Sequence, residues 1–468
     1  MDKYYREQLN RLRVGANEFA RRYPAIAPML FEEGGDPDVE RILEGTAWLC
    51  AKIQEHLDQT APDLIQALLR LIFPQAVLPY VSTTLIRFTL AQGFSETLHV
   101  PQGTQIASHP VDGVSCLYTT ILDLDVLPLQ VANVSTVASD SNVQTVKVTC
   151  TARAPLKSFL PPSLKFYLTG SYAHASQRFL LLLRNLIGIK VTADACQINL
   201  PPTALKASNL PLVDQRLAEK HRGHRGYMDI LRYFNFPEQL LCFELQGLEH
   251  LQLDLDCREL SLEFYLKNSF AEFVPFSDTS LTLNVVPAEN IFPVPAEPIQ
   301  VDHSREEYVI HPQDDHGRFL EILSIKNATC MFPGGKTMPC LPYKAYVKST
   351  QDLLYSIRYR KNDRDGSIDH LIMPIYKMAN KKDLPDSYTL SMLLLCCNHS
   401  LPSSLQVGDI CRPTDTSPAQ ATFTNITPPS HMCPRPQTES LQWRFLAHMH
   451  ANLLSLASAE ALRQFLAL

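Results

Sequence analysis

A chain of 468 residues that is 45% hydrophobic and 19% charged is too long for one compact core and too apolar to be disordered, so we expect two to four globular domains. Its formal net charge of −6 gives it no general attraction for nucleic acid or anionic lipid, and we expect neither as a partner. The 34 Pro against 17 Gly favour many loop breaks and edge strands and argue against a helical bundle throughout.

The first residues, Met1–Glu7, are charged where a secretory signal has an apolar stretch, so we expect no such signal. No window approaches the ~20 apolar residues of a membrane span. The best candidate, residues 179–189, is interrupted by Arg184. We therefore expect a cytoplasmic protein without direct membrane insertion, whose 12 Cys are reduced and mostly buried as small apolar residues.

Residues 1–75 show helical periodicity. A first helix is predicted to end at Tyr23, before Pro24. A second helix is predicted to begin at Pro37, because Asp36 is a favourable N-cap and proline suits the first helical position. Pro62 is predicted to restart a third helix, which ends before Pro74.

These helices carry more apolar and aromatic residues than a short helical segment can bury by itself, which predicts an assembly surface. We interpret residues 1–80 as a helical assembly segment. We expect its partner-facing side chains to be Tyr4, Tyr5, Leu9, Leu12, Phe19, Leu43, Leu49, Leu64 and Leu68.

From about residue 82 the apolar period changes from 3.6 to 2, which predicts antiparallel strands with one wet face. The pattern is cleanest at residues 260–266 and recurs at 86–90, 146–150, 281–285 and 353–359. The predicted fold class is α+β and multi-domain, with an N-terminal helical segment, mostly antiparallel β-rich modules and a short C-terminal helical stretch. We expect β-rich domains at residues 81–240 and 241–412, then a Pro-rich loop (residues 413–436) and C-terminal helices up to residue 468.

Two short motifs imitate ligand-binding loops. Gly335–Thr337 resembles the end of a phosphate-binding loop, but Cys330 stands where that motif requires glycine, so a hairpin turn is predicted. Asp363–Gly366 resembles part of a calcium loop, but Lys361 and Ile372 occupy positions that require carboxylates. A turn that joins two strands is predicted there.

Thiols and imidazoles are densest near the C-terminal end, but their spacing does not match the paired ligands of zinc sites. We therefore predict no metal, no cofactor and no small-molecule substrate. The chain also lacks the common catalytic motifs, so no catalytic residue is assigned and a non-enzymatic protein is favoured. A metal-dependent hydrolase stays the weakest alternative, and it would use Cys396, Cys397, His399, Cys411, His431 and Cys433.

A basic hexapeptide, Lys220–Arg225, is either a solvated loop or a contact for an acidic partner surface. Aromatic residues follow it closely in the sequence. As a second partner interface we select Arg222, Arg225, Tyr227, Tyr233 and Phe234.

Distinctive residue patterns occur in several segments, namely the Tyr4 and Tyr5 pair and residues 18–24, 36–45, 226–238, 290–293, 297–299, 397–402 and 443–456. Together these segments resemble the TssF baseplate family of the bacterial type VI secretion system. The match departs at Arg232, where the family usually has an acidic residue, and at His399 and Ser400, which replace a charged pair. Family members usually continue beyond the position of Leu468.

The resemblance implies a structural wedge subunit of a contractile-injection baseplate, similar to a wedge protein of contractile phage tails. It also implies partners: two TssF copies pair with one TssG-like subunit and join TssK, TssE and a VgrG hub, at the inner face of the bacterial inner membrane. Such a wedge would help to build the platform on which tube and sheath polymerise. The alternative from another class is a β-sandwich ligand- or carbohydrate-binding protein with a helical appendage.

Overall fold

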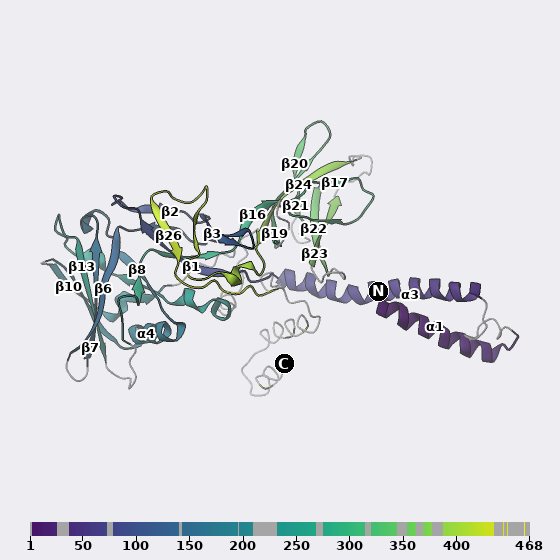
Figure 1. Ribbon diagram of the computed structural model, residues 1–468, viewed down its shortest axis with the longest axis horizontal. Helices are drawn as coiled ribbons and strands as arrows, with labels where there is room; N and C mark the ends of the chain where they lie inside the picture. The colour runs from purple at the N-terminus through teal and green to yellow at the C-terminus, as the bar shows by residue number, and fades with distance from the viewer. Residues whose placement is uncertain are drawn as a thin grey trace. The chain divides into compact units, whose positions relative to one another are not determined.

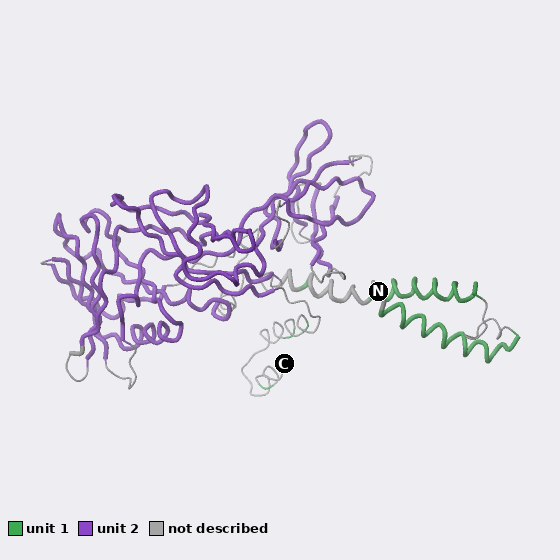
Figure 2. The backbone as a smooth tube through the Cα atoms, in the orientation of Figure 1, with its two compact units in different colours: residues 1–77, 435–468 green, residues 78–434 purple. Residues whose placement is uncertain are grey.

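The protein forms two compact units, residues 1–77 with 435–468 and residues 78–434 (Figure 2). Within residues 37–72 the structure describes the whole backbone but only part of the side chains. The computed structural model describes residues 2–25, 37–72, 78–139, 143–194, 196–208, 232–267, 275–313, 320–343, 353–361, 368–376 and 387–434, with Trp443, Ala447 and Arg463.

Unit 1 is built around two helices, α1 (Asp2–Arg22) and α3 (Pro37–Ile72), which pack along each other (Figure 1). The predicted end of the first helix and the predicted start at Pro37 are confirmed. The predicted break at Pro62 is wrong, because α3 runs through it as one helix of 36 residues. A proline has helical φ and removes one N–H donor, so a long helix can continue through it at a local cost.

Unit 2 contains a six-stranded sheet in the order β25-β3-β4-β15-β1-β26. The side chain of Asn425 links its two outer strands, because its Oδ1 accepts the N–H groups of Gly408 (2.9 Å) and Ile410 (3.0 Å). A two-stranded ribbon, β2 with β5, covers part of the same core. The bounds are β1 (Thr83–Leu90), β2 (Leu98–Val100), β3 (Gln105–Val111), β4 (Val114–Thr120), β5 (Leu124–Val126), β15 (Val285–Glu289), η7 (Leu401–Ser404), β25 (Ile410–Pro413) and β26 (Ala421–Asn425).

A second core lies between a five-stranded sheet, β10-β9-β13-β7-β6, and a four-stranded sheet, β11-β12-β8-β14. The helix α4 packs its buried face on this core. The bounds are β6 (Leu129–Ser139), β7 (Val143–Ala152), η2 (Leu156–Ser158), β8 (Ser163–Leu168), α4 (Tyr172–Arg184), β9 (Leu186–Ala193), β10 (Cys196–Leu200), η3 (Pro202–Ala204), β11 (Leu205–Ala207), η4 (Pro237–Leu240), β12 (Cys242–Gln246), η5 (Leu248–His250), β13 (Glu259–Lys267) and β14 (Leu281–Thr282).

A third core, from residues 292 to 396, lies between the sheet β16-β24-β19-β20, with β17 beside β24, and the sheet β18-β23-β22-β21. Among the described strands of unit 2, every pair is antiparallel except β21 with β22. The bounds are β16 (Phe292–Pro295), β17 (Ile299–Val301), β18 (Tyr308–Val309), β19 (Glu321–Met331), β20 (Thr337–Pro339), β21 (Leu341–Pro342), β22 (Leu353–Lys361), β23 (Ile368–Tyr376) and β24 (Tyr388–Cys397).

The predicted α+β class, with N-terminal helices and mostly antiparallel modules, is confirmed. The position 240/241, where a domain boundary was predicted, falls inside the second core, because β8 pairs with β12 across it. The loop predicted at residues 413–436 contains a strand, β26, which pairs with β1. Of the predicted C-terminal helices, only isolated positions lie within the described residues.

Candidate partner interface

An apolar stripe on α3 is exposed to solvent in unit 1. Ile42, Leu49, Ile53 and Leu57 are 67%, 58%, 61% and 59% exposed. They follow one another at intervals of seven, four and four residues, which is the spacing of a helix–helix seam. We call these four residues the α3 seam. A single exposed leucine is ordinary on a protein surface, whereas four in one row mark a surface for contact with another chain.

The opposite face of α3 is covered by α1. Ala47 and Ala51 on α3 and Ala20 on α1 are fully buried, and such small side chains let two helix backbones approach closely. At 100° per residue, Ile42 lies about 140° around the helix from Ala47. The ion pair of Arg13 with Glu40 joins the two helices at their side. The α3 seam therefore points away from α1 and remains open in the described part of unit 1.

The aromatic end of α1 is also partly exposed. Phe19 and Tyr23 are about half exposed, and their ring centroids lie 4.7 Å apart. On α3, the ammonium group of Lys52 lies 4.0 Å from the ring centre of Trp48, which is likewise half exposed. A cation over an aromatic face partly satisfies both groups. Trp48 is therefore an exposed apolar residue outside the α3 seam.

The predicted helical interface residues separate into two groups. Phe19, Leu49 and Leu68 are exposed. The side chain of Leu64 lies outside the description. Half-buried side chains on the two packed helices form the other group, namely Tyr4, Tyr5, Leu9, Leu12 and Leu43.

The prediction did not select the seam residues Ile42, Ile53 and Leu57. All three were visible as apolar residues at helical spacing in the sequence. Their heptad-like intervals from Leu49 are the signal that separates them from the residues packed against α1.

The second predicted interface is only partly described. Arg222, Arg225 and Tyr227 lie outside the described residues. Tyr233 and Phe234 are exposed, with ring centroids 5.4 Å apart in an edge-to-face arrangement. Two exposed aromatic side chains in contact are suited to bury apolar surface against a partner.

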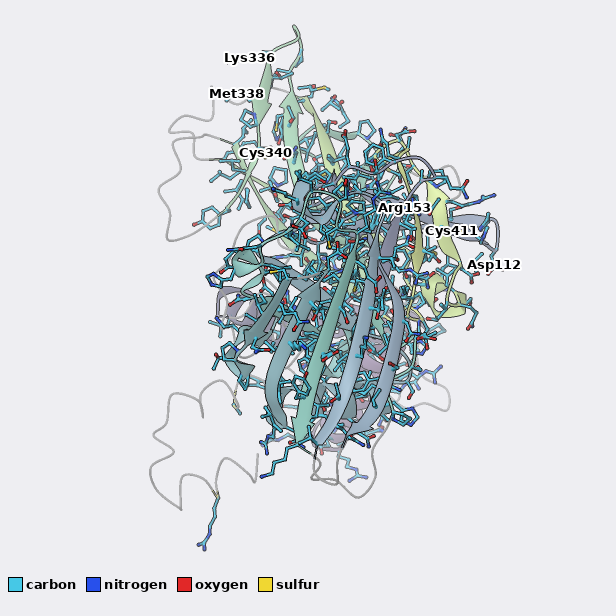
Figure 3. All side chains as sticks on the ribbon, turned by 90° about the vertical axis from the view of Figure 1, so that its left-hand side faces the viewer. Asp112, Arg153, Lys336, Met338, Cys340 and Cys411 are labelled. Carbon is cyan, nitrogen blue, oxygen red and sulfur yellow. The ribbon has the colours of Figure 1, made fainter. Side chains whose placement is uncertain are left out.

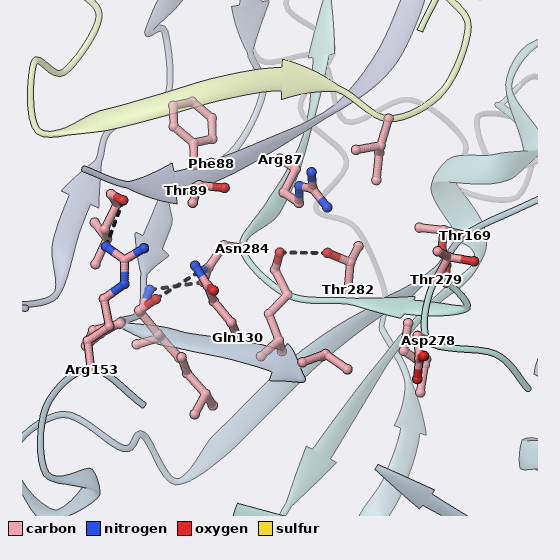
Figure 4. Close-up of a pocket in the computed structure, with 18 of the residues that line it drawn as sticks. Arg87, Phe88, Thr89, Gln130, Arg153, Thr169, Asp278, Thr279, Thr282 and Asn284 are labelled. Atoms are coloured by element: carbon pink, nitrogen blue, oxygen red, sulfur yellow. Dashed lines mark hydrogen bonds between the residues drawn. The ribbon is translucent and has the colours of Figure 1, made fainter. Parts of the chain in front are cut away.

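A cavity of about 560 Å³ opens in unit 2 beside β1, β6 and β14 (Figure 4). Arg153 Nη1 at its edge donates hydrogen bonds to the carbonyl oxygens of Leu90 (3.0 Å) and Ala91 (2.8 Å). Phe88 is the one aromatic residue among the described lining residues, and its side chain is buried. The cavity therefore lacks the exposed aromatic platform expected of a carbohydrate-binding cleft.

The thiols and imidazoles of the C-terminal part are separated in the fold. Cys396 belongs to the third core, whereas its neighbour Cys397 packs on the opposite side of β24 with Val81 and Leu323. Adjacent strand residues point to opposite faces, which explains the separation. Within the described residues, no three His, Cys, Asp or Glu side chains come together as metal ligands would.

The two loop-like motifs have different outcomes. The predicted hairpin turn at Gly335–Thr337 is confirmed, since it joins β19 to β20 and Phe332 N donates to Lys336 O at 2.9 Å (Figure 3). Gly334 and Gly335 have φ of 92° and 82°, which favours glycine at both positions. The predicted turn at Asp363–Gly366 lies outside the described residues, although β22 and β23 on either side of it pair.

No helix in the described parts of the chain has the length and apolar composition needed to cross a membrane.

Comparisons with known proteins place the chain among baseplate proteins. The family model "Type VI secretion system, TssF" matches residues 1–468. The type VI secretion system component TssF1 of Pseudomonas aeruginosa is 26% identical over 523 residues, which cover 100% of this chain and 83% of the relative.

Two solved structures share the fold. The first is the type VI secretion system TssK-TssF-TssG baseplate subcomplex, seen by cryo-electron microscopy. A chain of it matches with a TM-score of 0.77 and 22% identity over 92% of this chain and 81% of its own. The second is the baseplate complex from the type VI secretion system. It matches with a TM-score of 0.56 and 19% identity over 98% of this chain and 81% of its own.

Proposed function

The chain belongs to the TssF family of the type VI secretion system, and from this premise we propose that it is a structural wedge subunit of the secretion baseplate. In this role it assembles with a TssG-like partner and helps to build the platform on which tube and sheath polymerise. The proposal gives the chain no catalytic role.

The observation that supports this role best is the α3 seam. Four large aliphatic side chains lie exposed in one row of a 36-residue helix, whose other face is already covered by α1. Water contact with this apolar surface is unfavourable at ~25 cal/mol per Å², so a covering partner is favoured. The heptad-like intervals suit a helix as the covering element. We assign that helix to the TssG-like partner.

Further contacts are proposed from the family and its solved relatives. The similar chain of known structure occurs in a subcomplex with TssK and TssG. We propose the same two partners here, with two copies of this chain for each TssG-like subunit, and TssE and a VgrG hub as neighbours in the complete baseplate. Tyr233 and Phe234, with the basic Arg222 and Arg225 that precede them in sequence, are proposed as a second contact. In the assembled state we place the chain at the cytoplasmic face of the inner membrane.

Co-expression with the TssG-like protein of the same organism tests the proposal. We expect the chain alone to self-associate and the co-expressed pair to elute as one complex, whose mass by light scattering equals two copies of this chain and one partner. A well-behaved monomer at all concentrations that does not retain the partner would contradict the wedge role. Such a monomer would favour the ligand-binding alternative, with the cavity of unit 2 as the candidate ligand site.

A further inference from the structure

The N-terminal end of α4 is an uncapped helix terminus. Ser171 is the N-cap residue with extended backbone (φ −63°, ψ 142°), but its hydroxyl makes no capping hydrogen bond. The first hydrogen bond along the helix is that of Ala175 N to Ser171 O (2.9 Å). The N–H groups of the first turn have no acceptor within a helix, and they carry its positive dipole end. This end of α4 therefore offers donors to a negatively charged group.

A buried arginine lies beside the same terminus. Arg178 is 8% exposed, although its guanidinium is charged. Its Nη2 donates to Pro275 O (2.8 Å), while its buried Nε has no acceptor within the described residues. Burial lowers the pKa of Arg178, because desolvation disfavours the charged form. No carboxylate of the described residues forms an ion pair with it. Its charge faces the carbonyl dipole of Pro275 and the ring of Phe276, whose centroid lies 5.6 Å from Arg178 Cζ.

Gly170 leaves room in front of that guanidinium. It precedes Ser171 and lines the cavity of Figure 4. A Cβ at Gly170 would lie 3.7 Å from Arg178 Nη1, and this is the one heavy atom beyond its chain neighbours that it would approach within 4 Å. The φ of Gly170 is +103°, which side-chain-bearing residues rarely adopt. The guanidinium and the helix terminus thus border one open position.

We propose that the first turn of α4, Gly170 and Arg178 form a binding site for an oxyanion, either a carboxylate or a phosphate. The first-turn N–H groups of α4 and the Arg178 guanidinium beside Gly170 are hydrogen-bond donors, and the guanidinium is positively charged, so an oxyanion would complete their hydrogen bonds. The carboxylate of Asp278, on the same cavity wall, already accepts Val134 N at 2.7 Å. An acidic side chain of a partner protein and free phosphate are the two sources of this chemistry.

Two variants distinguish an anion-binding role of this site from a purely structural role of Arg178. Arg178→Met removes the donor and keeps an unbranched apolar stem. Ser171→Asp places a favourable N-cap carboxylate at the helix terminus, so it fills the position from within and preserves the fold. Arg184→Met is the matched control, because Arg184 is exposed in the last turn of the same helix.

The test is calorimetric titration of the full chain in complex with its TssG-like partner, at low ionic strength. Inorganic phosphate and a tetraglutamate peptide are the two probes, and each is titrated separately. Wild type and Arg184→Met are expected to bind at least one probe, and both other variants should bind it about tenfold more weakly or not at all. Tighter binding of the peptide identifies a protein carboxylate as the source, and binding of phosphate alone identifies the free ion. The proposal is overturned if wild type binds neither probe, or if both Ser171→Asp and Arg178→Met bind as wild type does.

Discussion

Ile53→Asp should separate assembly from folding more cleanly than any other change in the α3 seam. Ile53 is 61% exposed in the described unit, so most of its side chain makes no contact that the isolated chain could lose. Ile and Asp have similar helix propensities, and exposed substitutions usually change stability by less than about 0.5 kcal/mol. We therefore expect α1 and α3 to remain helical.

The cost on assembly is much larger. Full burial of an isoleucine side chain contributes about 1.5–3 kcal/mol, and the exposed 61% of Ile53 is what remains to be buried against a partner. The lost apolar contact therefore amounts to about 1–2 kcal/mol. An unpaired carboxylate in an apolar interface adds about 2 kcal/mol or more. Together these effects should weaken the complex by about 3 kcal/mol or more, which is ~100-fold in Kd.

The assay is a titration of the immobilised TssG-like partner, with circular dichroism as the check of helix content. Trp48→Asp is the matched control, because Trp48 is also exposed and apolar but lies about 140° around α3 from Ile53. We expect Trp48→Asp to bind within a few-fold of wild type. If Ile53→Asp binds normally and Trp48→Asp does not, the α3 seam is not the interface. If both variants lose binding with unchanged helix content, the partner contacts the Trp48 side of α3 as well as the α3 seam.

Three further predictions concern unit 2. Asn290→Ala should destabilise it by about 2 kcal/mol or more in urea unfolding, because the partly buried Leu117 O loses its donor and the buried Asn398 N loses its acceptor. The hydrogen bond of His99 to Asp125 at 2.7 Å raises the pKa of His99. The stability that this pair contributes is therefore present below the ordinary pKa of histidine and is lost as the pH rises through the raised pKa. In Asp125→Asn, NMR titration should show the pKa of His99 return toward its ordinary value. Burial raises the pKa of the Cys150 thiol to about 12, so iodoacetamide should label the exposed Cys433 in the native protein and Cys150 only after unfolding.

Local patterns predicted those elements whose burial alternates along the chain. Residues 260–266 read as a strand because β13 has one face in the second core and the other half-exposed. The burial of β26 alternates too, but this strand was not predicted, since it has only five residues and Pro-rich flanks. Its partner β1 lies more than 300 residues earlier, as the pairing of Ile86 with Asn425 illustrates. Pairing at that separation depends on the closed core, which no local period encodes.

The sequence predicted which segment carries the candidate interface, but it did not predict which face of α3 is exposed. The sequence places apolar residues on most of the circumference of α3, so Leu43 and Leu49 looked equivalent. In the fold Leu43 is half-buried and Leu49 is exposed, because α1 approaches α3 through Ala47 and Ala51. Alanine is a strong helix former and carries no distinctive signal in a sequence. The choice of the covered face was therefore decided by small residues that periodicity does not single out.

Two segments that resemble the TssF family meet inside unit 2. Asn290 Nδ2 donates to Leu117 O on β4 and to Asn398 Oδ1 after β24, both at 2.8 Å, and Asn398 N donates to Asn290 Oδ1 at 2.7 Å. Both side chains are nearly fully buried, and Ile291 and Cys397 pack beside them. Because each buried amide satisfies the other, neither sheet can shift without leaving a polar group unpaired.

This pair of asparagines therefore fixes the six-stranded sheet to the third core, which begins at Phe292. Such a joint holds the two sheets in one fixed arrangement, which suits a structural subunit. The acceptors and donors here are amides and carbonyls, which bind one another and do no acid–base chemistry near neutral pH. These family-like residues are thus accounted for by the rigidity of the joint between the six-stranded sheet and the third core.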